Sequence, residues 1–139
     1  MKAKSGFTLV EILIVVVILG ILAAIVIPQF TEASTEAKTS SLCTDLQTVR
    51  SQIELYKIQH NDSPPTAINF VAQMTGKTDV AGGVGTDYGP YLQKIPTNPF
   101  NDSDTIDASG NAGDGTGGWE YNETTGAINA DDSAEHALL

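Results

Sequence analysis

A long apolar run near the N-terminus constrains this chain more than any other feature. Every residue from 12 to 27 is apolar or glycine. Together with residues 7–10 the run reaches about 20 residues, which is the length of a helix that crosses the hydrocarbon core of a membrane. One acidic residue, Glu11, interrupts it. Because a charged side chain at the bilayer centre costs at least about 2.5 kcal/mol, the sequence predicts a partner for Glu11.

Two simple interpretations of this segment leave features unexplained. A secretory signal peptide has a shorter apolar core that ends at a small-residue cleavage site, whereas Ala23 and Ala24 are followed by further apolar residues. A plain membrane anchor explains the length of the run. It also explains the flanking Lys2 and Lys4, which would keep the N-terminus in the cytoplasm. It does not explain Glu11.

Cleavage of the peptide bond after Gly6 would explain the remaining features. Phe7 would then become the N-terminus and carry an ammonium group, because an α-amino group titrates near pH 7.7–8.0. In a stack of helices this ammonium would meet the Glu11 carboxylate of a neighbouring chain. Desolvation offsets much of the Coulomb attraction between two such charges. We therefore expect the pair to fix the register of assembly rather than to add much stability.

Residues 4–28 (KSGFTLVEILIVVVILGILAAIVIP) resemble the type III signal of type IV pilins and of the pseudopilins of type II secretion systems. The resemblance implies that a prepilin peptidase cleaves after Gly6 and that the new N-terminal residue, Phe7, is methylated. It also implies that Glu11 pairs with the N-terminus of a neighbouring subunit during assembly.

The same resemblance places helix breakers at Gly20 and Pro28. Pro28 lacks an N–H group and crowds the carbonyl of Ala24, so the helix is expected to bend or weaken there. Glycine costs roughly 1 kcal/mol relative to alanine in a helix interior. For Gly20, close packing against another helix in the membrane is an equal alternative.

The helix is predicted to continue past the apolar run as an amphipathic segment. Apolar residues recur at spacings of three and four, which is typical of a helix that packs one face on a core. They are Leu42, Leu46, Val49, Ile53 and Tyr56. Residues 60–65 (HNDSPP) then stop the helix. The favoured partner for this face is the chain's own head, because two heptads are too short to indicate a coiled coil.

The fold expected is α+β and type IV pilin-like, with a long N-terminal helix on a small head. The head should contain a short helix over residues 66–75 and a small antiparallel sheet, with a hairpin that pairs 119–121 with 127–129. The acidic tail, residues 131–139, is expected to be loosely ordered. Three parts follow: a leader (1–6), a transmembrane or filament-core helix (7–29), and a periplasmic head (30–139).

Two further stretches, GPYLQKIPTNPFN and GGWEYNETTGAINAD, resemble the C-terminal part of G-type major pseudopilins. Cys43 is the only cysteine, so the chain lacks the cysteine pair that staples a C-terminal loop in many pilins. The resemblance implies a structural subunit that polymerises into a pseudopilus, a piston or rotor for protein secretion. Its expected place is the bacterial inner membrane, in a single pass with the head in the periplasm, and then the pseudopilus.

The expected partners are further copies of the chain through the N-terminal helix, the prepilin peptidase, minor pseudopilins and an inner-membrane assembly platform. Two alternatives stay open. One is a type IV pilin for adhesion, motility or DNA uptake, and the other is a membrane-anchored periplasmic binding module that does not polymerise. The carboxylate of Glu11 separates the last alternative from the others, because a mere anchor gains nothing from it.

A polar, glycine-rich stretch concentrates oxygen ligands of the kind that Ca²⁺ prefers. Its acidic residues are Asp102, Asp104, Asp107 and Asp114. An EF-hand is excluded, because Ile106 occupies the third ligand position and Gly113 stands where a glutamate is needed. G-type pseudopilins bind calcium in a C-terminal loop, so calcium is the one cofactor considered. The alternative is a solvated loop whose Asp, Asn and Gly residues serve turn geometry.

The charge of the chain disfavours nucleic acid. The formal net charge is −10, and without Lys2 and Lys4 the other 5 basic and 17 acidic side chains give −12. Phosphate binding needs clustered lysine and arginine instead. Catalysis is also not expected, because neither a nucleophile–base pair nor a phosphate-binding loop is visible. His60 and His136, the two histidines, lie at a helix end and in the tail.

Overall fold

The apolar run and the amphipathic stripe form one continuous helix, α1 (Leu9–Gln59), of 51 residues. The computed structural model describes residues 6–139, so Lys2 and Lys4 of the expected leader lie outside the described residues. The chain divides by its internal contacts into two units, Met1–Ala37 and Lys38–Leu139. Helix α1 contributes to both, and each unit is described below by itself.

In the first unit, α1 exposes its apolar side chains on every face. By length and composition this part of α1 could cross a membrane. The helix continues without interruption through Gly20 and Pro28. The expected weakening at these two positions in a filament therefore stays a prediction.

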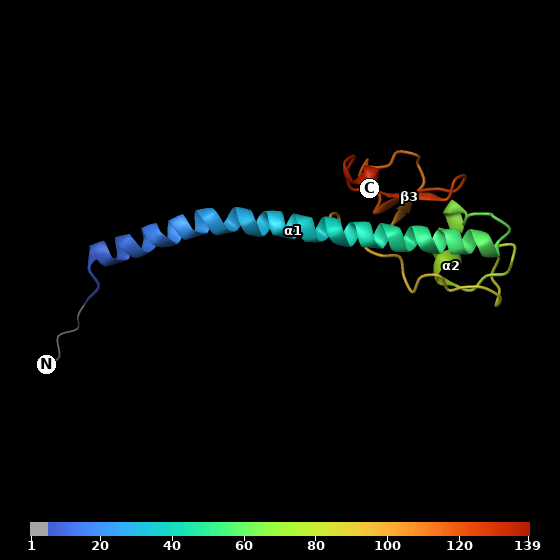
Figure 1. Ribbon diagram of the computed structural model, residues 1–139, viewed down its shortest axis with the longest axis horizontal. Helices are drawn as coiled ribbons and strands as arrows, with labels where there is room; N and C mark the ends of the chain where they lie inside the picture. The colour runs from blue at the N-terminus through green and yellow to red at the C-terminus, as the bar shows by residue number, and fades with distance from the viewer. Residues whose placement is uncertain (1–5) are drawn as a thin grey trace. The chain divides into compact units, whose positions relative to one another are not determined.

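In the second unit, one stripe of α1 is buried as predicted. The five stripe residues from Leu42 to Tyr56 have exposed fractions of 0–2%. They pack with Phe70 and Met74 of a short helix and with the aromatic side chains of Trp119 and Tyr121. In Figure 1 the remaining elements of the unit lie along the C-terminal part of α1. The core of the head is thus built on one face of a helix.

The end of α1 is fixed by side-chain and backbone hydrogen bonds. His60, which is 2% exposed, donates from Nδ1 to the Tyr56 carbonyl at 2.7 Å, and its Nε2 lies 2.9 Å from the Thr78 hydroxyl. The Asp62 N–H donates to the Lys57 carbonyl at 2.8 Å. These bonds satisfy carbonyls that every helix end leaves without an internal partner. The predicted stop at residues 60–65 is thereby confirmed.

The short helix expected over residues 66–75 is present as a 3₁₀ turn, η1 (Ala67–Asn69), followed by α2 (Phe70–Thr75). Three short strands follow: β1 (Ile106–Asp107), β2 (Trp119–Asn122) and β3 (Ala127–Ala130). Strands β2 and β3 form the predicted antiparallel hairpin, and β1 pairs with β2 in parallel. The α+β class is confirmed. The sheet is mixed and not purely antiparallel as predicted, because β1 pairs with β2 in parallel. Strand β1 was not predicted from the sequence.

The tight turn between β2 and β3 depends on Gly126. Its φ of 76° lies in the left-handed region, where residues other than glycine are strained. The Gly126 N–H donates to the Asn122 carbonyl at 2.8 Å. A Cβ at this position would also lie 3.4 Å from Pro64 and 3.5 Å from Ile53. The glycine therefore closes the hairpin through its positive φ, and these distances, which are ordinary contacts, show that the turn packs against the end of α1.

The C-terminal tail was predicted to be loosely ordered, and that prediction is wrong. Asp131 is fully buried, and η2 (His136–Leu138) ends the chain. The Asp132 carboxylate accepts hydrogen bonds from Asn98 Nδ2 at 2.7 Å and from His136 Nδ1. The tail is held by hydrogen bonds between polar side chains, so its low hydropathy did not indicate that it would be ordered.

We expect Leu46→Ala to lower the free energy of unfolding by about 2–5 kcal/mol, because it leaves a cavity in the core of the head. Trp119 is the only tryptophan and is fully buried, so its fluorescence reports on this core during denaturant unfolding of the full chain in detergent. The matched control is Leu55→Ala on the same helix, where the side chain is 40% exposed. Equal effects of the two substitutions would contradict the assignment of the buried stripe.

Candidate functional site

The predicted processing site lies just before α1. Gly6 and Phe7 are exposed and belong to neither a helix nor a strand, and Phe7 is 84% exposed. A Cβ built on Gly6 would meet no atom within 4 Å. The backbone that a peptidase would have to bind is therefore free of hydrogen-bonded secondary structure.

Glu11 and Thr8 form a reciprocal cap at the start of α1. The Thr8 N–H and the Thr8 hydroxyl each donate to Glu11 Oε2 at 2.7 Å. In return, the Glu11 N–H donates to Thr8 Oγ1 at 3.3 Å. This is the capping box, in which two N–H groups left free at a helix start are satisfied by side chains. Within a single subunit, Glu11 is thus held by its own chain.

The role of Thr8 was missed from the sequence, although a signal for it was present. Thr8 stands three residues before Glu11, at the beginning of an apolar run, and this spacing is the sequence signature of a capping box. The prediction sought the partner of Glu11 only in the N-terminus of a neighbouring chain. The structure shows that Thr8 of the same chain orients the carboxylate.

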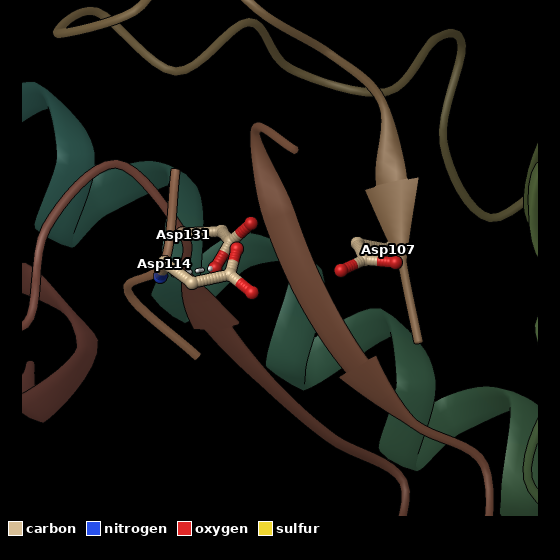
Figure 2. A group of neighbouring side chains, drawn as sticks. All are labelled: Asp107, Asp114 and Asp131. Carbon is tan, nitrogen blue, oxygen red and sulfur yellow. Dashed lines mark hydrogen bonds between the residues drawn. The ribbon is translucent and has the colours of Figure 1, made fainter. Parts of the chain in front are cut away.

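A second candidate site is a group of three aspartates in the head. One carboxylate oxygen from each of Asp107, Asp114 and Asp131 lies within 4.8 Å of the others (Figure 2). Asp107 comes from β1, Asp114 from the loop between β1 and β2, and Asp131 from the residue after β3. The parallel pairing of β1 with β2 brings these segments together.

Asp131 organises the loop between β1 and β2. Its Oδ1 accepts hydrogen bonds from the N–H groups of Gly113 at 2.7 Å and Asp114 at 3.2 Å, and its Oδ2 accepts from the Gly117 N–H at 2.7 Å. Hydrogen bonds to a charged acceptor are about twice as strong as neutral ones. A fully buried carboxylate with three backbone donors is therefore the main anchor of this loop.

Asp107 and Asp114 are more open to solvent than Asp131, and they share a hydroxyl donor. The Thr116 hydroxyl lies 2.8 Å from Asp107 Oδ2 and 2.6 Å from Asp114 Oδ1. The Ser109 hydroxyl donates to Asp107 Oδ2 at 2.7 Å, and these hydroxyl bonds lower the pKa of Asp107. Asp107 therefore remains ionised at neutral pH, which concentrates negative charge at the group.

Glu120 adds a fourth carboxylate to this region. It is 5% exposed, its Oε1 accepts the Gly110 N–H at 2.6 Å, and its buried Oε2 has no hydrogen-bond donor among residues 6–139. Burial raises the pKa of Glu120, and the charges of Asp107 and Asp131 add to this rise, while the Gly110 N–H opposes it. A buried carboxylate oxygen without a donor is unfavourable unless a proton, a cation or a water molecule satisfies it.

The structure revises the set of acidic residues drawn from the sequence. Asp107 and Asp114 come together as expected, and Asp131 joins them. Asp102 and Asp104 lie outside this group: the Asp102 N–H donates to the Asn98 carbonyl in a turn, and Asp104 lines a separate groove. Asp131 and Glu120 were missed because only tertiary packing brings them to the loop.

Comparison with known proteins gives consistent matches. A family model, the prokaryotic N-terminal methylation motif, matches residues 1–27. The type II secretion system core protein G of Pseudomonas aeruginosa is 34% identical over 99 residues, which cover 71% of this chain and 70% of the relative. The protein of the same name from Vibrio cholerae is 30% identical over 133 residues, with 91% and 90% covered. No solved structure matches the chain significantly.

We expect Glu120→Gln to raise the melting temperature at pH 7 in the presence of a chelator. Because the folded state raises the pKa of Glu120, the ionised side chain destabilises the fold at neutral pH. This penalty disappears as the pH falls through the raised pKa, so the gain should shrink toward pH 4. Glutamine keeps the acceptor for Gly110. The control is Glu54→Gln, whose side chain is 64% exposed, and an unchanged melting temperature for Glu120→Gln at pH 7 would contradict the prediction.

Proposed function

Because this chain belongs to the family of the type II secretion system core protein G, we propose that it is a structural subunit of a pseudopilus and not an enzyme. Cleavage after Gly6 releases a chain that begins at Phe7 and is methylated there. The mature chains polymerise through residues 7–28. The observation that carries this proposal is the pair of features at the start of α1, an exposed Gly6–Phe7 bond and a capped carboxylate in an apolar helix.

The exposure of the first unit supports polymerisation. In this unit the large apolar side chains are 41–84% exposed, from Phe7 before α1 to Phe30 within it. Each needs an apolar environment, since burial of such a side chain contributes about 1.5–3 kcal/mol. Lipid supplies that environment before assembly, and the apolar helices of neighbouring subunits supply it afterwards. Repeated contacts of this kind do not close into a ring and so build a helical filament.

Glu11 sets the register of this assembly in the proposed mechanism. Both hydrogen bonds that its side chain accepts from Thr8 reach Oε2. The Oε1 side of the carboxylate is then the place where the ammonium of a neighbouring Phe7 binds. The new pair has a low dielectric around it, so a subunit in the wrong register would leave two charges uncompensated.

The proposed location follows from the same segment. The chain first sits in the bacterial inner membrane in a single pass with its head in the periplasm, and it then enters the periplasmic pseudopilus. Its partners are further copies of itself, the prepilin peptidase, minor pseudopilins and the inner-membrane assembly platform. The candidate spanning helix and the matched methylation motif support this placement.

We expect Glu11→Leu to abolish filament formation while membrane insertion and the head remain intact. The substitution removes the carboxylate that fixes register but keeps the helix apolar. Chemical cross-linking of neighbouring subunits in cells, quantified by immunoblot, reports on assembly, membrane fractionation reports on insertion, and Trp119 fluorescence reports on the head. Normal polymerisation of Glu11→Leu would overturn the proposed role of this residue.

Two controls keep this test specific. Glu32→Leu removes an acidic side chain from an exposed part of α1 beyond the apolar run and should leave assembly unchanged. Intact-mass measurement of the membrane protein should give a chain that starts at Phe7 and carries one additional methyl group. Filaments built from chains that still carry residues 1–6 would contradict the cleavage step.

We also propose that the aspartate group binds calcium. The residues fit a hard cation, because Asp107 and Asp114 supply carboxylate oxygens in a loop and Glu120 has a buried oxygen without a donor. Asp107 and Asp114 would hold the ion, while Asp131 keeps the loop in place through its three backbone donors. A bound cation would neutralise the repulsion among these carboxylates and so stabilise the head.

Addition of a chelator is expected to lower the melting temperature of the full chain in detergent. At a calcium concentration 100 times the dissociation constant, the lost stabilisation is about 2.7 kcal/mol. Asp107→Asn and Asp114→Asn should remove the calcium-dependent shift. Asp102→Asn and Asp104→Asn, outside the group, should keep it. A melting temperature that chelation leaves unchanged in the wild-type chain would refute calcium binding.

A further inference from the structure

Three tripeptides in the head have the pattern Asn-x-Ser/Thr, in which x is not proline. They begin at Asn61, Asn101 and Asn122. This pattern is the acceptor for N-linked glycans in proteins exposed outside the cytoplasm. The pattern alone is weak, because short motifs occur by chance. The three copies differ in their surroundings, however, so the structure can separate them.

Asn101 is exposed, but both ends of its amide are hydrogen-bonded to the backbone of the head. Its Nδ2 donates to the Gly117 carbonyl at 2.8 Å, and its Oδ1 accepts the Ser103 N–H at 3.1 Å. Attachment of a sugar to Nδ2 would displace the bond that joins this turn to the loop before β2. Asn101 is therefore a poor acceptor in the folded head.

Asn61 lies in the turn that ends α1. Its φ is 55°, and that of Asp62 is 64°. The next two N–H groups are used by the helix end, Asp62 to Lys57 at 2.8 Å and Ser63 to His60 at 3.1 Å. Pro64 and Pro65 follow directly. The tripeptide is thus locked in a conformation that an enzyme could not extend without unwinding the helix end.

Asn122 stands at the start of the tight turn between β2 and β3, where its carbonyl accepts the Gly126 N–H at 2.8 Å. It is the last residue of β2, and it is exposed together with Glu123, Thr124 and Thr125 at the tip of the hairpin. Its Oδ1 accepts the N–H groups of Thr124 at 3.0 Å and Thr125 at 3.1 Å. Among residues 6–139, no hydrogen bond involves its Nδ2. The amide nitrogen is therefore free, and the threonine two positions later is held close to it.

We propose that Asn122 is a site of N-glycosylation at the tip of the β2–β3 hairpin. The co-reactant is a glycan linked through its anomeric carbon to a polyprenyl diphosphate, and a membrane-bound oligosaccharyltransferase acts on it. Nδ2 of Asn122 loses a proton to solvent and forms a bond to the anomeric carbon. The bond from that carbon to the diphosphate oxygen breaks, and the polyprenyl diphosphate leaves with the electron pair.

The location of the tip agrees with this modification. Exposed hairpin tips tolerate bulky additions, because they contribute few buried contacts. Tyr121 and Ile128 next to the tip are each 1% exposed and belong to the hydrophobic core of the head. A glycan here would cover part of the head surface without entering its core. The inference rests on the proposed periplasmic position of the head, because the glycan donor faces that side of the membrane.

The test uses the full chain purified from its native cells and analysed by mass spectrometry. Digestion after lysine and arginine leaves residues 95–139 as one peptide, because no such residue follows Lys94. We expect added glycan mass on this peptide, located at Asn122 by fragmentation. Asn122→Gln and Thr124→Ala should abolish it, whereas Thr124→Ser, Asn101→Gln and the neighbouring Thr125→Ala should keep it.

A tag with a flexible Asn-x-Thr acceptor, placed after Leu139, tests the proposed periplasmic position of the head separately from the glycosylation of Asn122. If the tag is glycosylated while Asn122 is not, the inference is wrong and the periplasmic position of the head stands. If neither is modified in cells that glycosylate a periplasmic control protein, the proposed position of the head fails, and the inference fails with it. Glycan that persists in Asn122→Gln would likewise assign the modification to another residue and overturn the proposal.

Discussion

The need to compensate one carboxylate in an apolar helix governs the first half of this protein. Glu11 lies where neither lipid nor an apolar neighbour can solvate it. Thr8 supplies a partial answer within the chain, through an N–H and a hydroxyl at 2.7 Å each. These donors are neutral, so they orient the charge without balancing it. In the proposed assembly, the ammonium group of a neighbouring chain supplies the missing positive charge, and this pairing would connect the chemistry of one residue to the assembly of many subunits.

The two parts of α1 along its length suit two different environments. Up to Phe30 its large apolar side chains are exposed on all faces, while from Leu42 to Tyr56 one apolar stripe is buried against the head. The same backbone geometry is used throughout α1. The difference lies in the side-chain pattern, which suits a continuous apolar environment in one half and a single packed face in the other.

In the head, the arrangement of the loop between β1 and β2 depends on the carboxylate of Asp131. Asp131 is fully buried after the last strand and binds three backbone N–H groups of the β1–β2 loop. A loop that joins two parallel strands without a helix has few internal hydrogen bonds of its own, and the carboxylate replaces them. This arrangement gathers Asp107 and Asp114 around Asp131 and gives the head a region suited to a cation.

The sequence by itself determined the features that are local along the chain. The apolar run, the helical period from Leu42 to Tyr56, the stop after Gln59 and the β2–β3 hairpin all follow from the spacing of neighbouring residues, and the structure confirms them. The family resemblance is likewise confirmed by relatives of up to 34% identity. The capping role of Thr8 could also have been predicted, because its spacing from Glu11 is that of a capping box.

Only the tertiary structure decided the composition of the acidic site. Asp131 stands 17 positions from Asp114, and its role arises from hydrogen bonds across that distance. Glu120 comes from a strand in which alternation predicted no special function, and Asp102 and Asp104 were favoured only by their proximity along the chain. The parallel strand β1 has two residues, too few for any periodic signal. Helices and hairpins can be predicted from residues that are close along the chain, whereas a site built from several loops depends on the tertiary packing of the whole head.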